Sequence, residues 1–191
     1  MSAVSVLLLP GWQDSGPGHW QSLWESGHGC LRVEQHDWIR PLRGDWIARL
    51  EEVVLQHVAA SATPVVFAAH SLGCHLVAAW AAHSRHTGCV QGALLVAPGD
   101  PHEEALRSVL HSWWPPVLQR LPFPSTLLAS RDDPYCNFGR ATEFALAWGA
   151  ECIDYGQAGH INADSGLGAW PDGWRRLQAM CGQQHEQEHP W

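Results

Sequence analysis

The chain has 191 residues, 46% of them hydrophobic, and a formal net charge of −8 at pH 7. This length suits one domain with a substantial core, and the composition is that of a globular protein rather than a disordered one. The acidic balance argues against nucleic acid or an anionic membrane as the main partner, and no run approaches the ~20 apolar residues of a membrane span.

The chain shows no internal repeat and no interdomain linker. We predict one domain over residues 1–182 and a polar, mobile tail over residues 183–191. The apolar run at residues 4–9 is short and lacks a basic leader, so we expect no signal peptide and a cytoplasmic protein. The six cysteines are scattered without a C-x-x-C pair, which favours free, buried thiols over disulfides or a zinc site.

Six apolar runs have the length and composition of buried strands. The first, VSVLLL, is bounded by a Pro-Gly pair, and the third, VVFAA, is rich in β-branched and small side chains. The second run is the weakest and is expected near an edge of the sheet. The predicted strands are residues 4–9, 31–34, 65–69, 90–97, 125–129 and 151–154.

Helical patterns fill the intervals between these strands. Asp45 is the expected N-cap of an amphipathic helix, Gly149 closes another helix, and Pro171 lies in the first turn of the last one. The segment HSWWPP at residues 111–116 cannot form a regular helix and is a candidate lid. The predicted helices are residues 19–26, 45–58, 74–83, 103–110, 137–148 and 171–180.

The alternation of strands and helices predicts the architecture. It indicates a parallel sheet covered by helices on both faces, which is a three-layer α/β/α fold. Right-handed crossovers restrict the topology, and the doubly wound order 2-1-3-4-5-6 is the simplest solution. Its switch point lies between the first and third strands, where ligands bind in such sheets. The glycine-rich loop after the first strand and the turn after the third strand both end there.

The turn after the third strand reads Ala69-His70-Ser71-Leu72-Gly73. A buried strand, a sharp turn with a central serine and a helix are typical of a nucleophile elbow, which presents the hydroxyl above the sheet. The residues two before and two after the serine must be small. Gly73 meets this demand, and Ala69 replaces the usual glycine with one extra methyl group. The alternative interpretation is a serine that only caps the following helix.

A serine hydroxyl needs a base to take its proton and a group to orient that base. Asp132 and Asp133 follow the fifth strand, and His160 follows the sixth in a glycine-flanked turn. The chain order Ser, Asp, His is typical of α/β-hydrolases. We therefore predict Ser71 as nucleophile and His160 as general base. Spacing alone does not choose between Asp132 and Asp133, because an Asp-Pro pair is also an ordinary turn signal.

Two backbone N–H groups are predicted to form an oxyanion hole. One belongs to Leu72, directly after the serine, and the other to Trp12, in the loop after the first strand. Cys74 lies inside the following helix, where an inert buried thiol is a better interpretation than a nucleophile. The predicted chemistry requires no metal ion and no organic cofactor.

Several further side chains are candidates for contact with a substrate. His19 and Trp20 either line the site or cap and pack the first helix. Trp113 and Trp114 belong to the candidate lid. His70 adjoins the serine, but its side chain is expected to point away from it and to serve in packing or hydrogen bonding.

Four segments together resemble a known family. LPGWQDSGPGHWQSLWE, VVFAAHSLGCH, ASRDDPYC and GQAGHINADSGLGAWPDGW are similar to the small serine hydrolases related to the retinoblastoma-binding hydrolase and the bacterial YdeN proteins, over about residues 4–180. The resemblance implies a minimal α/β-hydrolase fold with a triad of Ser71, Asp133 and His160, because the family's aspartate immediately precedes the proline. The L-x-C-x-E peptide linked with retinoblastoma-protein binding is absent, so no such partner is inferred.

The sequence therefore predicts a serine hydrolase that cleaves small carboxylic esters or amides through an acyl-enzyme. We expect a small-molecule substrate, no nucleic acid or membrane partner, and a monomer or homodimer. Two alternatives stay open. One is a non-catalytic interaction module that keeps the hydrolase shape, since fold does not fix function. The other is an acyltransferase, in which the acyl group passes to an acceptor other than water.

Overall fold

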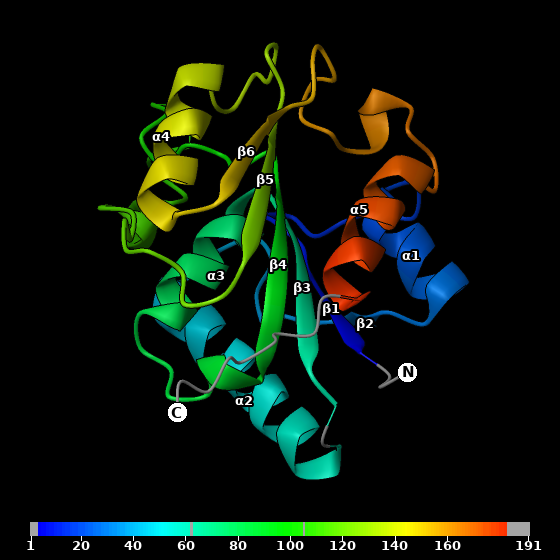
Figure 1. The fold of residues 1–191 in the computed structure, drawn as a ribbon. Coiled ribbons are helices and arrows are strands. Elements are labelled where there is room, and N and C mark those ends of the chain that lie inside the picture. The colour runs from blue at the N-terminus through cyan, green and yellow to red at the C-terminus, as the bar shows by residue number, and fades with distance from the viewer. Residues whose placement is uncertain (1–3, 62, 105, 183–191) are drawn as a thin grey trace, which may run out of the picture.

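The computed structural model describes residues 4–61, 63–104 and 106–182, and its centre is a six-stranded parallel sheet. The strand order is β2-β1-β3-β4-β5-β6, which confirms the predicted doubly wound topology (Figure 1). The predicted tail, residues 183–191, lies outside the described residues. The strands are β1 (Ser5–Leu9), β2 (Leu31–Arg32), β3 (Val65–His70), β4 (Val90–Val96), β5 (Ser125–Ala129) and β6 (Glu151–Asp154).

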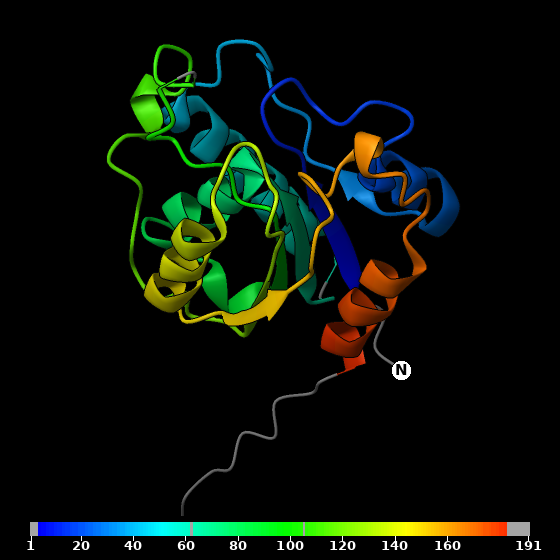
Figure 2. The same ribbon diagram turned by 90° about the horizontal axis from the view of Figure 1, so that it is seen from above.

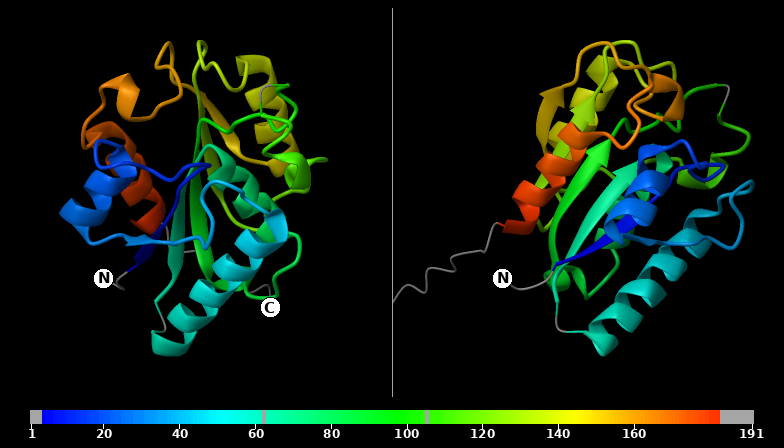
Figure 3. Two further views of the ribbon diagram at one scale, coloured as in Figure 1. Left: turned by 180° about the vertical axis from the view of Figure 1, so that it is seen from behind. Right: turned by 90° about the vertical axis from the view of Figure 1, so that its right-hand side faces the viewer.

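Helices cover both faces of this sheet (Figures 1 and 3). Two of them, α1 and α5, lie on one face, and α2, α3 and α4 lie on the other. None of the described helices is long and apolar enough to cross a membrane. The helices are α1 (Trp20–His28), α2 (Arg43–Ala60), α3 (Leu72–Ala81), α4 (Phe138–Trp148) and α5 (Pro171–Gly182).

The side-chain alternation of the strands divides the core into two layers. In β1, Leu7 and Leu9 pack in the layer under α2, α3 and α4, whereas Leu8 packs in the layer under α1 and α5. All six residues of β3 are buried, because a central parallel strand is covered on both sides. This explains why the run VVFAA shows no polar alternation in the sequence.

The high tryptophan count serves the core. Seven tryptophans are almost fully buried, and each indole N–H donates to a protein oxygen. A large aromatic ring can be buried at little polar cost when its N–H is bonded in this way. The seven are Trp20, Trp24, Trp46, Trp80, Trp113, Trp148 and Trp170.

Three local predictions were wrong. Helix α2 begins at Arg43, with Leu42 as N-cap, so Asp45 lies inside the first turn instead of capping it. The described residues of 103–110 form consecutive turns rather than a helix, because several of their backbone bonds span three residues, such as Leu106 N–H to Glu103 C=O at 2.9 Å. The six cysteines are free, but only three are buried.

The carboxyl ends of the strands meet at one edge of the sheet, onto which Figure 2 looks from above. The loop after β1, the turn after β3 and the loops after β5 and β6 all emerge at this edge. Because β1 and β3 are neighbours and their following helices lie on opposite faces, a crevice opens between them. The fold thus brings the predicted site residues together.

Candidate active site

The turn between β3 and α3 has the strained geometry of a nucleophile elbow. Ser71 has φ 54° and ψ −122°, a conformation that L-residues rarely adopt. A Cβ atom on Gly73 would overlap the carbonyl of Leu9, so only glycine fits between α3 and the end of β1. Ala69, at the other small position, is fully buried within β3. The extra methyl group of Ala69 is therefore accommodated.

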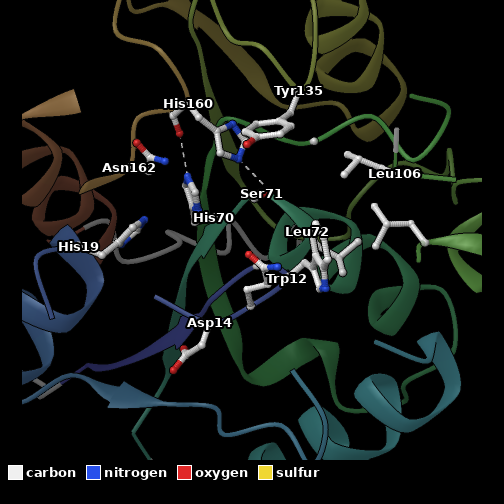
Figure 4. A pocket seen from close by; sticks show the side chains of 14 residues that line it. Trp12, Asp14, His19, His70, Ser71, Leu72, Leu106, Tyr135, His160 and Asn162 are labelled. Atoms are coloured by element: carbon white, nitrogen blue, oxygen red, sulfur yellow. Dashed lines mark hydrogen bonds between the residues drawn. The ribbon is translucent and has the colours of Figure 1, made fainter. Parts of the chain in front are cut away.

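Three side chains form a continuous hydrogen-bonded chain at this turn. The Ser71 hydroxyl lies 2.9 Å from Nε2 of His160, and Nδ1 of His160 lies 2.8 Å from Oδ2 of Asp133 (Figure 4). A carboxylate only accepts hydrogen bonds, so Nδ1–H donates and Nε2 is left to accept the serine proton. The Asp133 side chain is 2% exposed and that of His160 is 9% exposed.

The neighbouring carboxylate has a different set of partners. Oδ1 of Asp132 accepts from the Ser130 hydroxyl at 2.7 Å and from the Gly159 N–H at 2.9 Å. These two bonds lower the pKa of Asp132. Asp132 therefore fastens the loop after β5 to the turn that carries His160. Of the two aspartates that the spacing left open, Asp133 is the one that contacts His160.

The loop after β1 passes directly against the elbow. A Cβ atom built on Gly11 would lie 2.8 Å from the Ser71 Cβ and 3.2 Å from the Leu72 nitrogen. Among the described residues, no acceptor is found for the N–H of Trp12 or of Leu72. The two predicted donors therefore lie on segments in close contact, and the rest of the described chain leaves both N–H groups unused.

His70 holds the main chain of the segment that carries His160. Its Nε2–H donates to the His160 carbonyl at 2.8 Å, and its side chain points away from the serine hydroxyl, as predicted. Burial holds the pKa of His70 well below its usual range, and the neighbouring His19 and His160 add to this. His70 is therefore a neutral donor at physiological pH.

A cavity of about 250 Å³ opens beside Ser71 and His160 (Figure 4). His19, one of the four side chains predicted to contact a substrate, lines it and also caps α1 by accepting the Gln21 N–H. The other three do not line it. Trp20, the first residue of α1, is buried against Trp170, and Trp113 is buried with its N–H donating to the Pro41 carbonyl.

Trp114 is exposed and contacts His102 instead. No residue of the candidate lid, 111–116, lines the cavity, which is lined instead by Leu106 and Leu110 of the turns that precede it. Their pattern suggested only a helix. Tyr135 and Asn162 also line the cavity, and each lies two residues beyond a triad position, in the motifs DPY and HIN. Their closeness in sequence to Asp133 and His160 was the signal that could have marked them as cavity residues.

Two further observations concern the Cys74 thiol and the metal-ligating side chains. Burial raises the pKa of the Cys74 thiol far above its usual value, as expected for an inert thiol. Within the part of the chain that the structure describes, no group of three or more His, Cys, Asp or Glu side chains could hold a metal ion.

Comparisons with known proteins identify the family and the fold. Residues 6–179 match the model of a family described as serine hydrolase. A YdeN-like hydrolase from Pectobacterium atrosepticum is 30% identical, with 93% of this chain and 90% of that chain covered and a TM-score of 0.78. The ydeN product of Bacillus subtilis is 18% identical, with 95% and 100% covered and a TM-score of 0.74.

A thermophilic esterase from Thermogutta terrifontis, solved with butyrate, shares the fold at 19% identity, with 93% of this chain and 81% of that chain covered and a TM-score of 0.64. A search of the curated proteins finds no match. The family model spans most of this chain. The alignment with the Pectobacterium protein covers nearly the whole length of both chains. The chain therefore belongs to the serine hydrolase family and has the α/β-hydrolase fold.

Proposed function

We propose that this serine hydrolase cleaves small carboxylic esters through an acyl-enzyme formed on Ser71. The observation that carries the proposal is the hydrogen-bonded chain from Ser71 through His160 to Asp133, at the tip of a strained elbow. The cavity of about 250 Å³ supports a small substrate, since pockets for drug-sized ligands start at about 300 Å³.

The first half-reaction transfers the acyl group to the protein. Ser71 Oγ attacks the ester carbonyl carbon while His160 Nε2 takes the hydroxyl proton. The carbonyl oxygen becomes an oxyanion, and the N–H groups of Trp12 and Leu72 donate to it. The carbon–oxygen bond to the alcohol then breaks, and His160 returns its proton to the departing oxygen. The products are a free alcohol and an ester of Ser71.

The second half-reaction repeats these steps with water. His160 takes a proton from a water molecule, whose oxygen attacks the acyl carbon. The bond to Ser71 Oγ breaks, and His160 gives the proton to that oxygen. The carboxylic acid leaves, and Ser71 is restored. Asp133 keeps the proton on Nδ1 of His160 throughout, and it stabilises the imidazolium that forms in each half-reaction.

Kinetics on a p-nitrophenyl ester of a short acid test this proposal. We expect steady turnover by the wild type, with a burst of one p-nitrophenol per protein where deacylation is slow. Ser71→Ala and His160→Ala should lose turnover by several orders of magnitude while remaining folded. The rate of hydrolysis of the matching p-nitroanilide shows whether the same site also cleaves amides. Turnover that survives in Ser71→Ala would contradict the assignment of the nucleophile.

The cellular location, the partners and the state of assembly of the protein stay predictions. A cytoplasmic location is supported by the six unpaired cysteines, one of them exposed, because a reducing compartment keeps thiols free. We propose a small-molecule substrate as the only partner that the site requires. The state of assembly, monomer or homodimer, is read directly from light scattering in solution.

A further inference from the structure

The cavity beside Ser71 has two chemically different walls, which lie on opposite sides of the serine in Figure 4. On one side, Leu72, Leu106 and Leu110 are part of the hydrophobic core under α2, α3 and α4, and the partly buried Trp12 packs against that core. We call these four the apolar wall. On the other side lie polar residues of the loop after β1, of α1's N-cap and of the loop after β6. Of these, we call His19 and Asn162 the polar wall.

Both residues of the polar wall carry a hydrogen-bond donor that the protein leaves unused. His19 is 5% exposed and its Nδ1 accepts the Gln21 N–H, so the neutral ring has its proton on Nε2. Within the described residues, this buried Nε2 has no hydrogen-bond partner. A buried donor without a protein acceptor is rare, and in a residue that lines a cavity a ligand or a water molecule can supply the acceptor.

Asn162 is fixed in a complementary way. Its Oδ1 accepts the N–H of Asp164 at 3.1 Å, which leaves its amide N–H₂ group as the free end. Figure 4 shows that nitrogen on the side of the amide that faces His70 and His160. Among the described residues, no acceptor is found for it. It lines the same cavity as Ser71 and His160.

The polar wall carries no net charge. Burial lowers the pKa of His19 to about 3, so its ring is neutral at physiological pH. The nearby Asp14 carboxylate, which also lines the cavity, is paired with Arg32. Two neutral donors and a compensated carboxylate favour a group that offers uncharged acceptor oxygens, such as an ether or a hydroxyl, over an anion or an alkyl chain.

The two walls correspond to the two halves of an ester substrate, the acyl group and the alcohol. The acyl carbon is bonded to the oxygen that the N–H groups of Trp12 and Leu72 would bind, and the side chains of these same residues form part of the apolar wall. The alcohol half begins at the oxygen that His160 would protonate, and we place it in the part of the cavity that His19 and Asn162 line. Each half of the substrate therefore meets a wall of different polarity.

We propose that the preferred substrates are esters of a short apolar acid with an alcohol that carries a further oxygen, and that His19 and Asn162 recognise this oxygen. The inference rests on the proposed ester hydrolysis and adds the substrate class. It assigns the acyl chain to the apolar wall and the alcohol to the polar wall.

A matched pair of esters tests the polar wall. In 2-methoxyethyl butyrate one oxygen replaces a methylene group of n-butyl butyrate, so the two alcohols have the same length. We expect wild-type kcat/KM to favour the methoxyethyl ester. In His19→Asn and Asn162→Ser, which keep a capping acceptor, this preference should fall about fivefold, the value of one neutral hydrogen bond. Comparing the same pair in each variant cancels the intrinsic reactivity of the alcohols.

Leu110→Ala provides the matched control for the apolar wall. It should shift the preferred acyl chain toward longer acids and leave the alcohol preference unchanged. His19→Asn should lower the alcohol preference and leave the preferred acyl chain unchanged. An equal alcohol preference in wild type and both polar-wall variants would overturn the inference. So would a loss of alcohol preference in Leu110→Ala together with a shift in acyl-chain preference in His19→Asn. If the wild type hydrolysed neither ester, the proposed function itself would fail, which is a separate outcome from hydrolysis without preference.

Discussion

The loop after β1 is expected to be as sensitive to a single methyl group as the elbow itself. In Gly11→Ala, the new Cβ would lie 2.8 Å from the Ser71 Cβ and 3.2 Å from the Leu72 nitrogen. Carbon atoms make favourable contact at about 3.5 Å, so the loop must withdraw by ~0.7 Å. This movement carries the neighbouring Trp12 N–H away from the oxyanion that it is proposed to bind.

The size of the effect follows from that displacement. Misplacing a catalytic group by about 1 Å lowers the rate by about 100-fold, and losing one oxyanion donor lowers kcat by about 100- to 1,000-fold. We therefore expect kcat of Gly11→Ala to fall between about 30- and 300-fold, because the donor is displaced rather than removed. KM should change little, since the oxyanion exists only during the reaction.

Gly16 is the matched control in the same loop. It is exposed, and a Cβ atom built on it would meet nothing within 4 Å. Both variants would be assayed on one p-nitrophenyl ester, with thermal unfolding by circular dichroism to show that each is folded. If folded Gly11→Ala retained kcat within twofold of Gly16→Ala, the loop after β1 would not supply the oxyanion donor.

Three further predictions concern the groups around His160 and the buried histidines. Asp133→Asn should lower kcat by about 10⁴-fold, because the imidazole loses its working tautomer, whereas Asp132→Asn should cost about 1 kcal/mol of stability and change kcat less than tenfold. Equal losses of kcat would refute the distinction. His70→Phe should reduce kcat without raising KM, because it frees the His160 carbonyl from its 2.8 Å bond, and an unchanged kcat would show that this bond positions nothing. The folded protein depresses the pKa of His19 to about 3 and of His75 to about 4, chiefly by burial. Both histidines bind a proton more readily in the unfolded chain than in the folded one. Their contribution to the free energy of unfolding is therefore fully present above about pH 6.5 and falls as the pH drops toward 4. Each contributes up to about 1.4 kcal/mol per pH unit in that window. Urea unfolding midpoints at pH 7.5 and pH 5 measure the loss, and equal midpoints would contradict it.

The sheet was predictable because buried parallel strands leave a direct signature. Five of the six strand predictions fall within one residue of the structure at each end, and the observed strand order is the simplest one that right-handed crossovers allow. The weak second run shrinks to Leu31–Arg32, since an edge strand needs few ladder bonds. Local patterns were less decisive for helix starts. Asp45 has the side chain of an N-cap, but the chain enters α2 two residues earlier, after Leu42.

The hydrogen-bonded group of Ser71, His160 and Asp133 was predictable for a similar reason, since its members follow three parallel strands at one edge of the sheet. The choice between Asp132 and Asp133 required the family resemblance or the structure, because both aspartates occupy the same loop. Substrate contacts were harder to predict. Trp20 and Trp113 attracted attention as large aromatic residues, yet their rings complete the core and their N–H groups are bonded there. Leu106 and Leu110 reach the cavity only through the tertiary path of the turns that carry them.

The most direct test of the account is covalent labelling with a fluorophosphonate, read by mass spectrometry of the intact protein and its peptides. The account predicts one adduct on wild-type protein, located on Ser71, and none on Ser71→Ala. His160→Ala should label far more slowly, because no base takes the hydroxyl proton. A wild-type protein that stays unlabelled where another serine hydrolase reacts, or an adduct that persists in Ser71→Ala, would contradict the claim that Ser71 is an activated nucleophile.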